Sequence, residues 1–145
     1  MFVLDKQLAK DCVVLGRFDL SRLLLMNDAN YPWLVLVPEI NGVTELNQLD
    51  WCDQLRLMRE INIISGVLSR EFQPEKLNIA ALGNLVPQLH VHCIARYKTD
   101  AVWPKPVWGQ VDACPYSLDE LEDQKKKIIA AVVDLVNGNP EVSFT

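Results

Sequence analysis

The sequence predicts an α+β domain with an antiparallel sheet of about five strands, a long helix packed on the sheet and a C-terminal helix. Three observations predict this fold. Short apolar runs bounded by turn residues indicate strands. One long stretch repeats its apolar residues three and four positions apart, which is typical of a helix. Near the C-terminus, a capping sequence precedes a second amphipathic stretch. No repeat or linker divides the chain, so we expect a single domain over residues 1–145.

The first third of the chain contains three predicted strands. Residues 12–16 and 21–26 are apolar runs joined by a short connection, which favours a hairpin. Residues 27–32 have the composition of a turn. The next run, 33–37, has no polar break and is followed by Pro38. We therefore expect it to be a central strand covered on both faces.

A long helix is predicted to begin after Asp50, whose side chain can accept a hydrogen bond from the first turn. Pro74 prevents its continuation. Its inward face is predicted from the apolar spacing of Trp51, Leu55, Met58, Ile61, Ile64 and Leu68. The outer face is expected to carry the charged residues Asp53, Arg56, Arg59, Glu60 and Arg70.

Two strands and a helix complete the predicted fold. Residues 77–82 form a strand that leads into another apolar run at 88–96. Further along, Ser117 and Glu120 have the spacing of a capping box. The apolar periodicity behind them predicts a helix at about 118–136, ended by Gly138 and Pro140.

The run at 88–96 contains the only two histidines of the chain, His90 and His92. Side chains alternate between the two faces of a strand, so the histidines should lie on one face. Their expected neighbours on that face are Gln88, Ile94 and Arg96. The opposite face is apolar and should pack on the core through Leu89, Val91, Cys93 and Ala95.

Composition excludes several classes of function. A net charge of −5 without a long basic run argues against a nucleic-acid surface. The four cysteines are scattered, which is typical of reduced thiols in a cytosolic protein. No apolar run approaches 18 residues, and the first residues lack a signal-peptide pattern. We therefore expect a soluble cytoplasmic protein without membrane contact.

Two histidines spaced two apart on a strand have three interpretations. They could be ordinary strand residues. They could be two ligands of a metal, but a catalytic zinc needs a third protein ligand and the chain has no further histidine. Third, one imidazole could be a nucleophile toward phosphorus, which requires a free lone pair on one nitrogen and a proton on the other.

The third interpretation gains support from a resemblance. The stretch Pro87-Gln88-Leu89-His90-Val91-His92-Cys93-Ile94 resembles the histidine triad (HIT) motif, with glutamine in place of the first histidine. Two further blocks resemble the family in order and spacing. One is Met26-Asn27-Asp28 followed by Trp33-Leu34-Val35-Leu36-Val37-Pro38, and the other is Gly83-Asn84-Leu85-Val86. The resemblance covers roughly residues 12–97, the expected core, and leaves 98–145 as a C-terminal extension.

The resemblance implies a HIT-like fold and roles for individual residues. His90 would attack the α-phosphorus, and the carbonyl of Gln88 would fix its tautomer. His92 would donate to the phosphate or bridging oxygen, and the Gln88 amide could donate to a phosphate oxygen. Asn27 would bind ribose, although it could simply be a turn residue. Asn84 would contact phosphate, and Leu25 would help to wall the base pocket.

The implied function is hydrolysis of a phosphoanhydride or phosphoramidate of a nucleoside monophosphate through a nucleotidyl-histidine intermediate. A dinucleoside polyphosphate such as diadenosine tetraphosphate is the leading substrate. The segment 103–109 resembles a bacterial branch of the family labelled dinucleoside-polyphosphate hydrolases. The family implies a homodimer. We expect no metal or other cofactor, because the chain has only two histidines and no paired-cysteine motif. The alternatives are a nucleotide-binding regulatory module with little activity, which Gln88 favours, and a nucleotidyltransferase.

The segment 99–116 carries two tryptophans and several prolines and must lie on another part of the molecule. Trp103 and Trp108 could pin it to the sheet or a helix. Alternatively, it borders the active site or crosses to a partner subunit.

Overall fold

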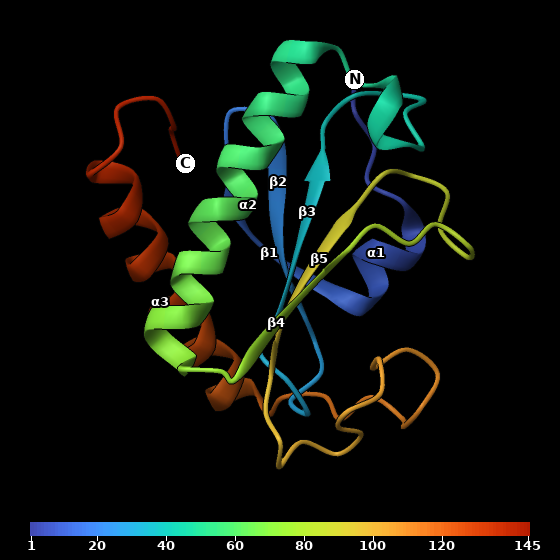
Figure 1. Cartoon of the computed structure of the whole chain (residues 1–145), viewed down its shortest axis with the longest axis vertical. Helices are drawn as coiled ribbons and strands as arrows, with labels where there is room; N and C mark the ends of the chain where they lie inside the picture. Colours follow the sequence, from blue (N-terminus) through green and yellow to red (C-terminus); the bar gives the residue numbers. More distant parts are fainter.

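Five antiparallel strands form the predicted sheet, in the order β1-β2-β3-β5-β4 (Figure 1). The computed structural model describes all 145 residues. The strands are β1 Cys12–Arg17, β2 Ser21–Met26, β3 Trp33–Pro38, β4 Lys76–Ala80 and β5 Val91–Arg96. The helices are α1 Lys6–Asp11, α2 Trp51–Phe72 and α3 Leu118–Asn137, with a 3₁₀ turn at Leu46–Gln48. The α+β class, the five strands and the two long helices are therefore confirmed.

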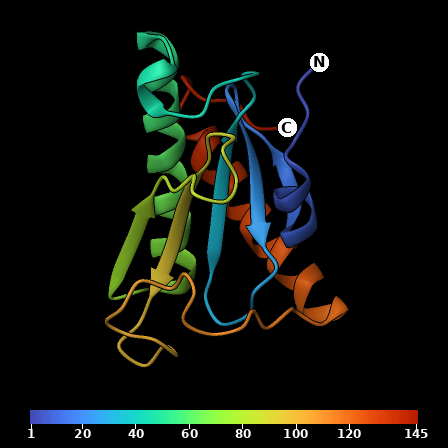
Figure 2. The same ribbon diagram turned by 90° about the vertical axis from the view of Figure 1, so that its right-hand side faces the viewer.

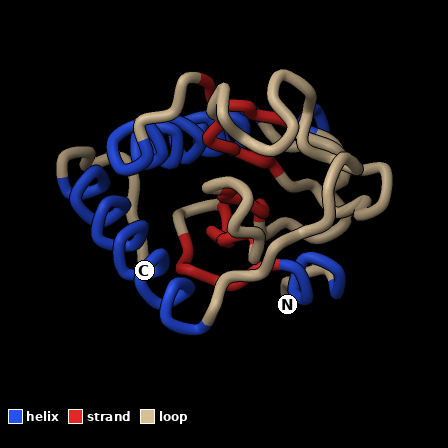
Figure 3. The backbone as a smooth tube through the Cα atoms, turned by 90° about the horizontal axis from the view of Figure 1, so that it is seen from below, coloured by secondary structure: helices blue, strands red, loops and turns tan.

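Different elements pack on the two faces of the sheet. The long helices α2 and α3 lie on one face, over a large apolar core (Figures 2 and 3). The short helix α1 and part of the segment 99–116 lie on the other face, over a smaller apolar cluster that includes Trp33, Val35 and Ile94. The candidate site lies on this second face, because the long helices α2 and α3 cover the first.

Strand β3 is central, as its unbroken apolar sequence predicts. Every residue of β3 is buried, and the strand pairs with β2 on one side and β5 on the other. Its register with β5 places Val35 opposite His92 and Trp33 opposite Ile94. Trp33 and His92 are therefore diagonal neighbours on the same face of the sheet.

The predicted inward face of α2 is wrong in the first half of the helix. Trp51, Leu55 and Met58 are exposed, whereas Leu57 and Glu60 are buried. Apolar residues occupy two stripes of this helix, and spacing alone does not distinguish them. The buried stripe contains a carboxylate because the Glu60 Oε1 accepts hydrogen bonds from the backbone N–H groups that begin β2, at 2.8 and 3.3 Å.

The helix ends follow the expected capping chemistry. Asp50 caps α2 by accepting from the N–H of Asp53, and α2 ends before Pro74. Ser117 and Glu120 form the predicted capping box at the start of α3. On α3, however, Val133 is 40% exposed, although it is one of the apolar residues whose periodicity predicts this helix.

Candidate active site

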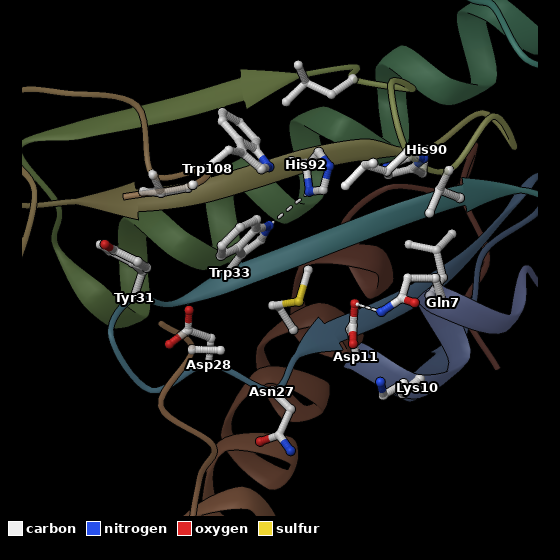
Figure 4. A pocket seen from close by; sticks show the side chains of 18 of the residues that line it. Gln7, Lys10, Asp11, Asn27, Asp28, Tyr31, Trp33, His90, His92 and Trp108 are labelled. Carbon is white, nitrogen blue, oxygen red and sulfur yellow. Dashed lines mark hydrogen bonds between the residues drawn. The ribbon is translucent and has the colours of Figure 1, made fainter. Parts of the chain in front are cut away.

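A pocket of about 740 Å³ opens on the face of the sheet that α1 covers (Figure 4). The sheet side of the pocket is formed by Trp33, His90 and His92. Residues of α1, of the loop at 82–86 and of the segment 107–115 line the remaining sides. This volume is in the range of small-molecule sites.

The imidazole of His90 is held by the backbone two residues earlier. Its Nδ1 lies 2.7 Å from the carbonyl oxygen of Gln88. A carbonyl oxygen can only accept a hydrogen bond, so Nδ1 carries the proton. In the neutral ring, Nε2 of His90 therefore has a free lone pair, which is what a nucleophilic histidine requires.

The imidazole of His92 has the opposite arrangement. The indole Nε1–H of Trp33 donates to the Nδ1 of His92 at 3.0 Å (Figure 4). An indole can only donate, so Nδ1 is the acceptor and the neutral ring carries its proton on Nε2. The two rings are adjacent, with centres 4.8 Å apart, and one offers a lone pair while the other offers an N–H.

Aromatic rings enclose His92. The rings of Trp33 and Trp108 pack edge to face against it, with centre distances of 5.5 and 5.2 Å. Burial, with a smaller contribution from His90, lowers the pKa of His92 to about 3. His92 is therefore a neutral hydrogen-bond donor at physiological pH.

Arg96 holds the segment that brings Trp108 to the site. Its buried guanidinium pairs with Asp100, with the closest N–O distance 2.7 Å, and donates to the carbonyl of Lys105 at 2.8 Å. A buried charge is stable only with such partners, so the turn from 96 to 105 is fixed. Trp108 packs on Trp33 and His92 and also lines the pocket, so the segment 99–116 both lies on the sheet and borders the site.

Comparison with known proteins identifies the family. The HIT domain model matches residues 7–99. The chain belongs to the HIT domain family. None of the curated proteins compared with the chain matches it.

Solved structures of three HIT proteins are similar to the whole fold. The chain is 43% identical to a histidine triad protein from Bradyrhizobium japonicum, over 90% of this chain and 98% of that one, with a TM-score of 0.88. It is 41% identical to one from Marinobacter aquaeolei VT8, over 93% and 98%, with a TM-score of 0.90. For one from Sinorhizobium meliloti 1021, the identity is 40%, the coverage 90% and 97%, and the TM-score 0.88.

Gln88, which the sequence resemblance aligns with the first histidine of the HIT motif, turns its side chain away from the pocket. The Oε1 accepts from the N–H of Asp5, and the Nε2 donates to the carbonyl of Val3, both at 2.9 Å. The expected donation from Gln88 to a phosphate oxygen is therefore wrong. Strand β5 begins only at Val91 and Gln88 lies in a bend, so the alternation of a strand does not apply to it.

The two predicted asparagines line the pocket. The Oδ1 of Asn27 accepts from the N–H of Tyr116 at 3.0 Å, which leaves its Nδ2 free to donate. Asn84 is exposed. Leu25 is misplaced by the prediction: it pairs with Leu34 and packs in the core on the helix side of the sheet. A shift of one residue along a strand changes the face, and Met26 lines the pocket instead.

Several pocket residues were not predicted from the sequence. They are Trp33, Tyr31 and Asp28 on or beside β3, and Gln7, Leu8, Lys10 and Asp11 on α1. Lys10 is the only lysine or arginine that lines the pocket. Only the β3–β5 register could have placed Trp33 beside His92, and no sequence signal reports that register. The pocket residues of α1 could not be predicted either, because the hydrogen bonds from Gln88 to the segment before α1 join residues that are far apart in the sequence.

The structure contains no group of three or more histidine, cysteine, aspartate or glutamate side chains placed to hold a metal ion. None of its helices is both long enough and apolar enough to span a bilayer.

Proposed function

We propose that this HIT protein is a nucleotide hydrolase that works through a nucleotidyl-histidine intermediate. The observation that carries the proposal is the pair of opposite tautomers: His90 presents a lone pair on Nε2, and His92 presents an N–H beside it. Two ordinary strand histidines have no need of two separate partners that fix complementary protonation states.

The proposed reaction has two steps. The Nε2 of His90 attacks the α-phosphorus, an N–P bond forms, and the bond from phosphorus to the bridging oxygen breaks. The carbonyl of Gln88 stabilises the ring, which becomes cationic while its Nδ1–H stays bonded to that oxygen. Water then attacks the phosphorus, the electron pair returns to Nε2, and the proton of the water passes to solvent.

Diadenosine tetraphosphate, or a related dinucleoside polyphosphate, is the proposed substrate. Apolar side chains such as Met26, Val86 and Trp108 suit a base, and the free amide of Asn27 suits a ribose hydroxyl. The exposed Asn84 lines the same pocket and is available to contact the remaining phosphates. The segment with Trp103 and Trp108 supports assignment to the bacterial branch labelled dinucleoside-polyphosphate hydrolases.

A homodimer is part of this proposal. Trp51 and Met58, exposed by 73% and 63%, form an apolar stripe with Leu55 on the outer side of α2. Large exposed apolar patches indicate interaction surfaces. Strand β4 lies at the edge of the sheet and has one unpaired side. We also place the protein in the cytoplasm, which its four free cysteines support.

The decisive experiment is turnover of diadenosine tetraphosphate in water enriched in heavy oxygen. A hydrolase releases adenosine monophosphate labelled with one heavy oxygen, because water attacks the adenylyl phosphorus. The His90→Ala variant should bind adenosine monophosphate but release none from the substrate. Binding without turnover in the wild type would instead favour the regulatory module, for which the displaced Gln88 side chain is the supporting observation. A mixed product with an added phosphorylated acceptor would favour a nucleotidyltransferase.

A further inference from the structure

The hydrogen bond between Trp33 and His92 fixes the tautomer of His92 and also prevents the ring from holding a second proton. A cationic imidazole needs a proton on both nitrogens. The Nδ1 of His92 receives the indole N–H of Trp33, so it cannot also carry a proton while this bond exists. His92 can therefore donate a hydrogen bond from Nε2, but it has no second proton to lose.

The surroundings make this bond a fixed part of the site. Trp33 is 7% exposed and begins the central strand β3. Its ring packs edge to face against those of Tyr31 and Trp108, at 6.3 and 5.9 Å. The indole cannot turn away without disturbing its packing against the rings of Tyr31, His92 and Trp108. The charged side chains that line the pocket, Lys10, Asp11 and Asp28, form no hydrogen bond with either imidazole.

We propose that Trp33 keeps His92 a neutral donor and thereby makes the site selective for phosphoanhydrides over phosphoramidates. This inference rests on the proposed hydrolase function and names the class of bond that it cleaves. Trp33 is a positioning residue in this scheme, because it acts on the substrate only through His92.

The selectivity follows from the fate of the leaving group. When an anhydride is cleaved, the electron pair of the broken P–O bond stays on the bridging oxygen, and the product departs as a phosphate anion. A hydrogen bond from the Nε2–H of His92 stabilises that oxygen without proton transfer. When a P–N bond is cleaved, the electron pair stays on nitrogen, which must gain a proton to leave as an amine. If His92 gave up its only proton it would become an imidazolate, so it cannot serve as that acid.

The test compares two substrates with the same adenylyl group, diadenosine tetraphosphate and adenosine 5′-phosphoramidate. The ratio of their kcat/KM values is measured for the wild type, Trp33→Phe and Trp33→His. Phenylalanine removes the indole N–H, and histidine offers a nitrogen that can accept from a protonated Nδ1. A positioned general acid accelerates reactions roughly 10²–10⁴-fold, so we expect Trp33→His, which can stabilise a cationic His92, to shift the ratio toward the phosphoramidate by about tenfold or more. Trp33→Phe should shift the ratio less, because burial still disfavours the cationic ring. Trp103→Phe is the matched control, because Trp103 packs over Arg96 and does not line the pocket; its ratio should stay at the wild-type value.

A nitrogen-15 NMR spectrum of His92 provides a readout that does not depend on turnover. In the wild type, Nδ1 should show the shift of an unprotonated nitrogen and Nε2 that of a protonated one, and Trp33→Phe should lose this fixed pattern. A wild type that prefers the phosphoramidate, or a ratio unchanged in both Trp33 variants, would overturn the inference. If neither substrate is cleaved, the proposed hydrolase function is wrong, and the inference about the leaving group is wrong as well. A wild-type spectrum with Nδ1 protonated would show that the tautomer assignment itself is wrong.

Discussion

At the scale of single residues, His90 and His92 differ because of what each Nδ1 contacts. One nitrogen donates to a backbone carbonyl, and the other accepts from an indole. The carbonyl fixes the proton of His90 on Nδ1 and leaves a lone pair on Nε2. The indole and the surrounding rings hold His92 neutral. Two identical side chains thus acquire different roles from their partners.

The depressed pKa of His92 predicts a loss of stability in acid. The folded-state pKa is about 3, whereas an unperturbed histidine titrates near 6.5. Between these values the unfolded chain binds a proton that the folded chain does not. The free energy of unfolding should therefore fall by about 1.4 kcal/mol per pH unit as pH drops from about 6.5 toward 3, from this group alone.

His92→Gln isolates this effect, because the glutamine amide can still accept from Trp33 but does not titrate. Denaturant unfolding of both proteins should give free energies whose difference is constant above about pH 7 and changes with the stated slope below it. Parallel curves through the whole acid range would mean that His92 titrates normally in the folded state.

Residue roles that depend on strand alternation were predicted well, and those at strand ends were not. The alternation of β5 correctly separates His92 from the core-facing Val91 and Cys93. It fails for Gln88 because the chain bends before the strand begins. The misplacement of Leu25 has a different cause: as a residue within β2, its face depends on a register that the sequence does not report.

At the scale of elements, the clamp between Gln88 and the N-terminal segment positions α1. The side-chain amide binds the backbone of Val3 and Asp5, directly before the helix whose residues line the pocket. Gln88→Ala removes both hydrogen bonds. At about 0.5–1.5 kcal/mol for each bond, or about 1–3 kcal/mol for both, amide hydrogen exchange in α1 should become roughly 5- to 150-fold faster, while exchange in β3 should not change.

Two variants of Asp5 provide the control for this prediction. Asp5→Pro removes the N–H that donates to Gln88, at a φ of −53° that proline tolerates, and Asp5→Ala removes the helix cap but keeps the N–H. In the wild-type background, amide exchange in α1 should be faster in Asp5→Pro than in Asp5→Ala. When Gln88→Ala is also present, exchange should be equally fast in the two Asp5 variants. Additive effects would mean that Gln88 does not hold the segment through Asp5.

The elements themselves were predictable because their signals are local. Asp50, Pro74 and the box at Ser117 mark helix ends through contacts within a few residues. The buried face of α2 is not a local property. It depends on Glu60 meeting the start of β2, 39 and 40 residues away along the chain, and on which of two apolar stripes the sheet covers.

At the scale of the whole molecule, the exposed stripe on α2 predicts the oligomeric state. We expect a dimer of about twice the 16.5 kDa chain mass in light scattering after size-exclusion chromatography. Met58→Glu places a charge in the proposed interface and should give monomers without unfolding the chain, because the side chain is already 63% exposed. Leu118→Glu, at an 83% exposed position of α3, is the matched control and should remain dimeric. A monomeric wild type at micromolar concentration would contradict the dimer.

The central claim is that His90 is the nucleophile, and chemical trapping of the intermediate tests it most directly. Wild-type protein quenched in alkali during turnover of diadenosine tetraphosphate should carry an adenylyl group that is stable to base and released by acid, as a phosphoramidate is. Peptide mass spectrometry should locate this group on His90. We expect no adduct in His90→Ala, and an adduct still on His90 in His92→Gln. An adduct on His92, or one that persists in His90→Ala, would contradict the account.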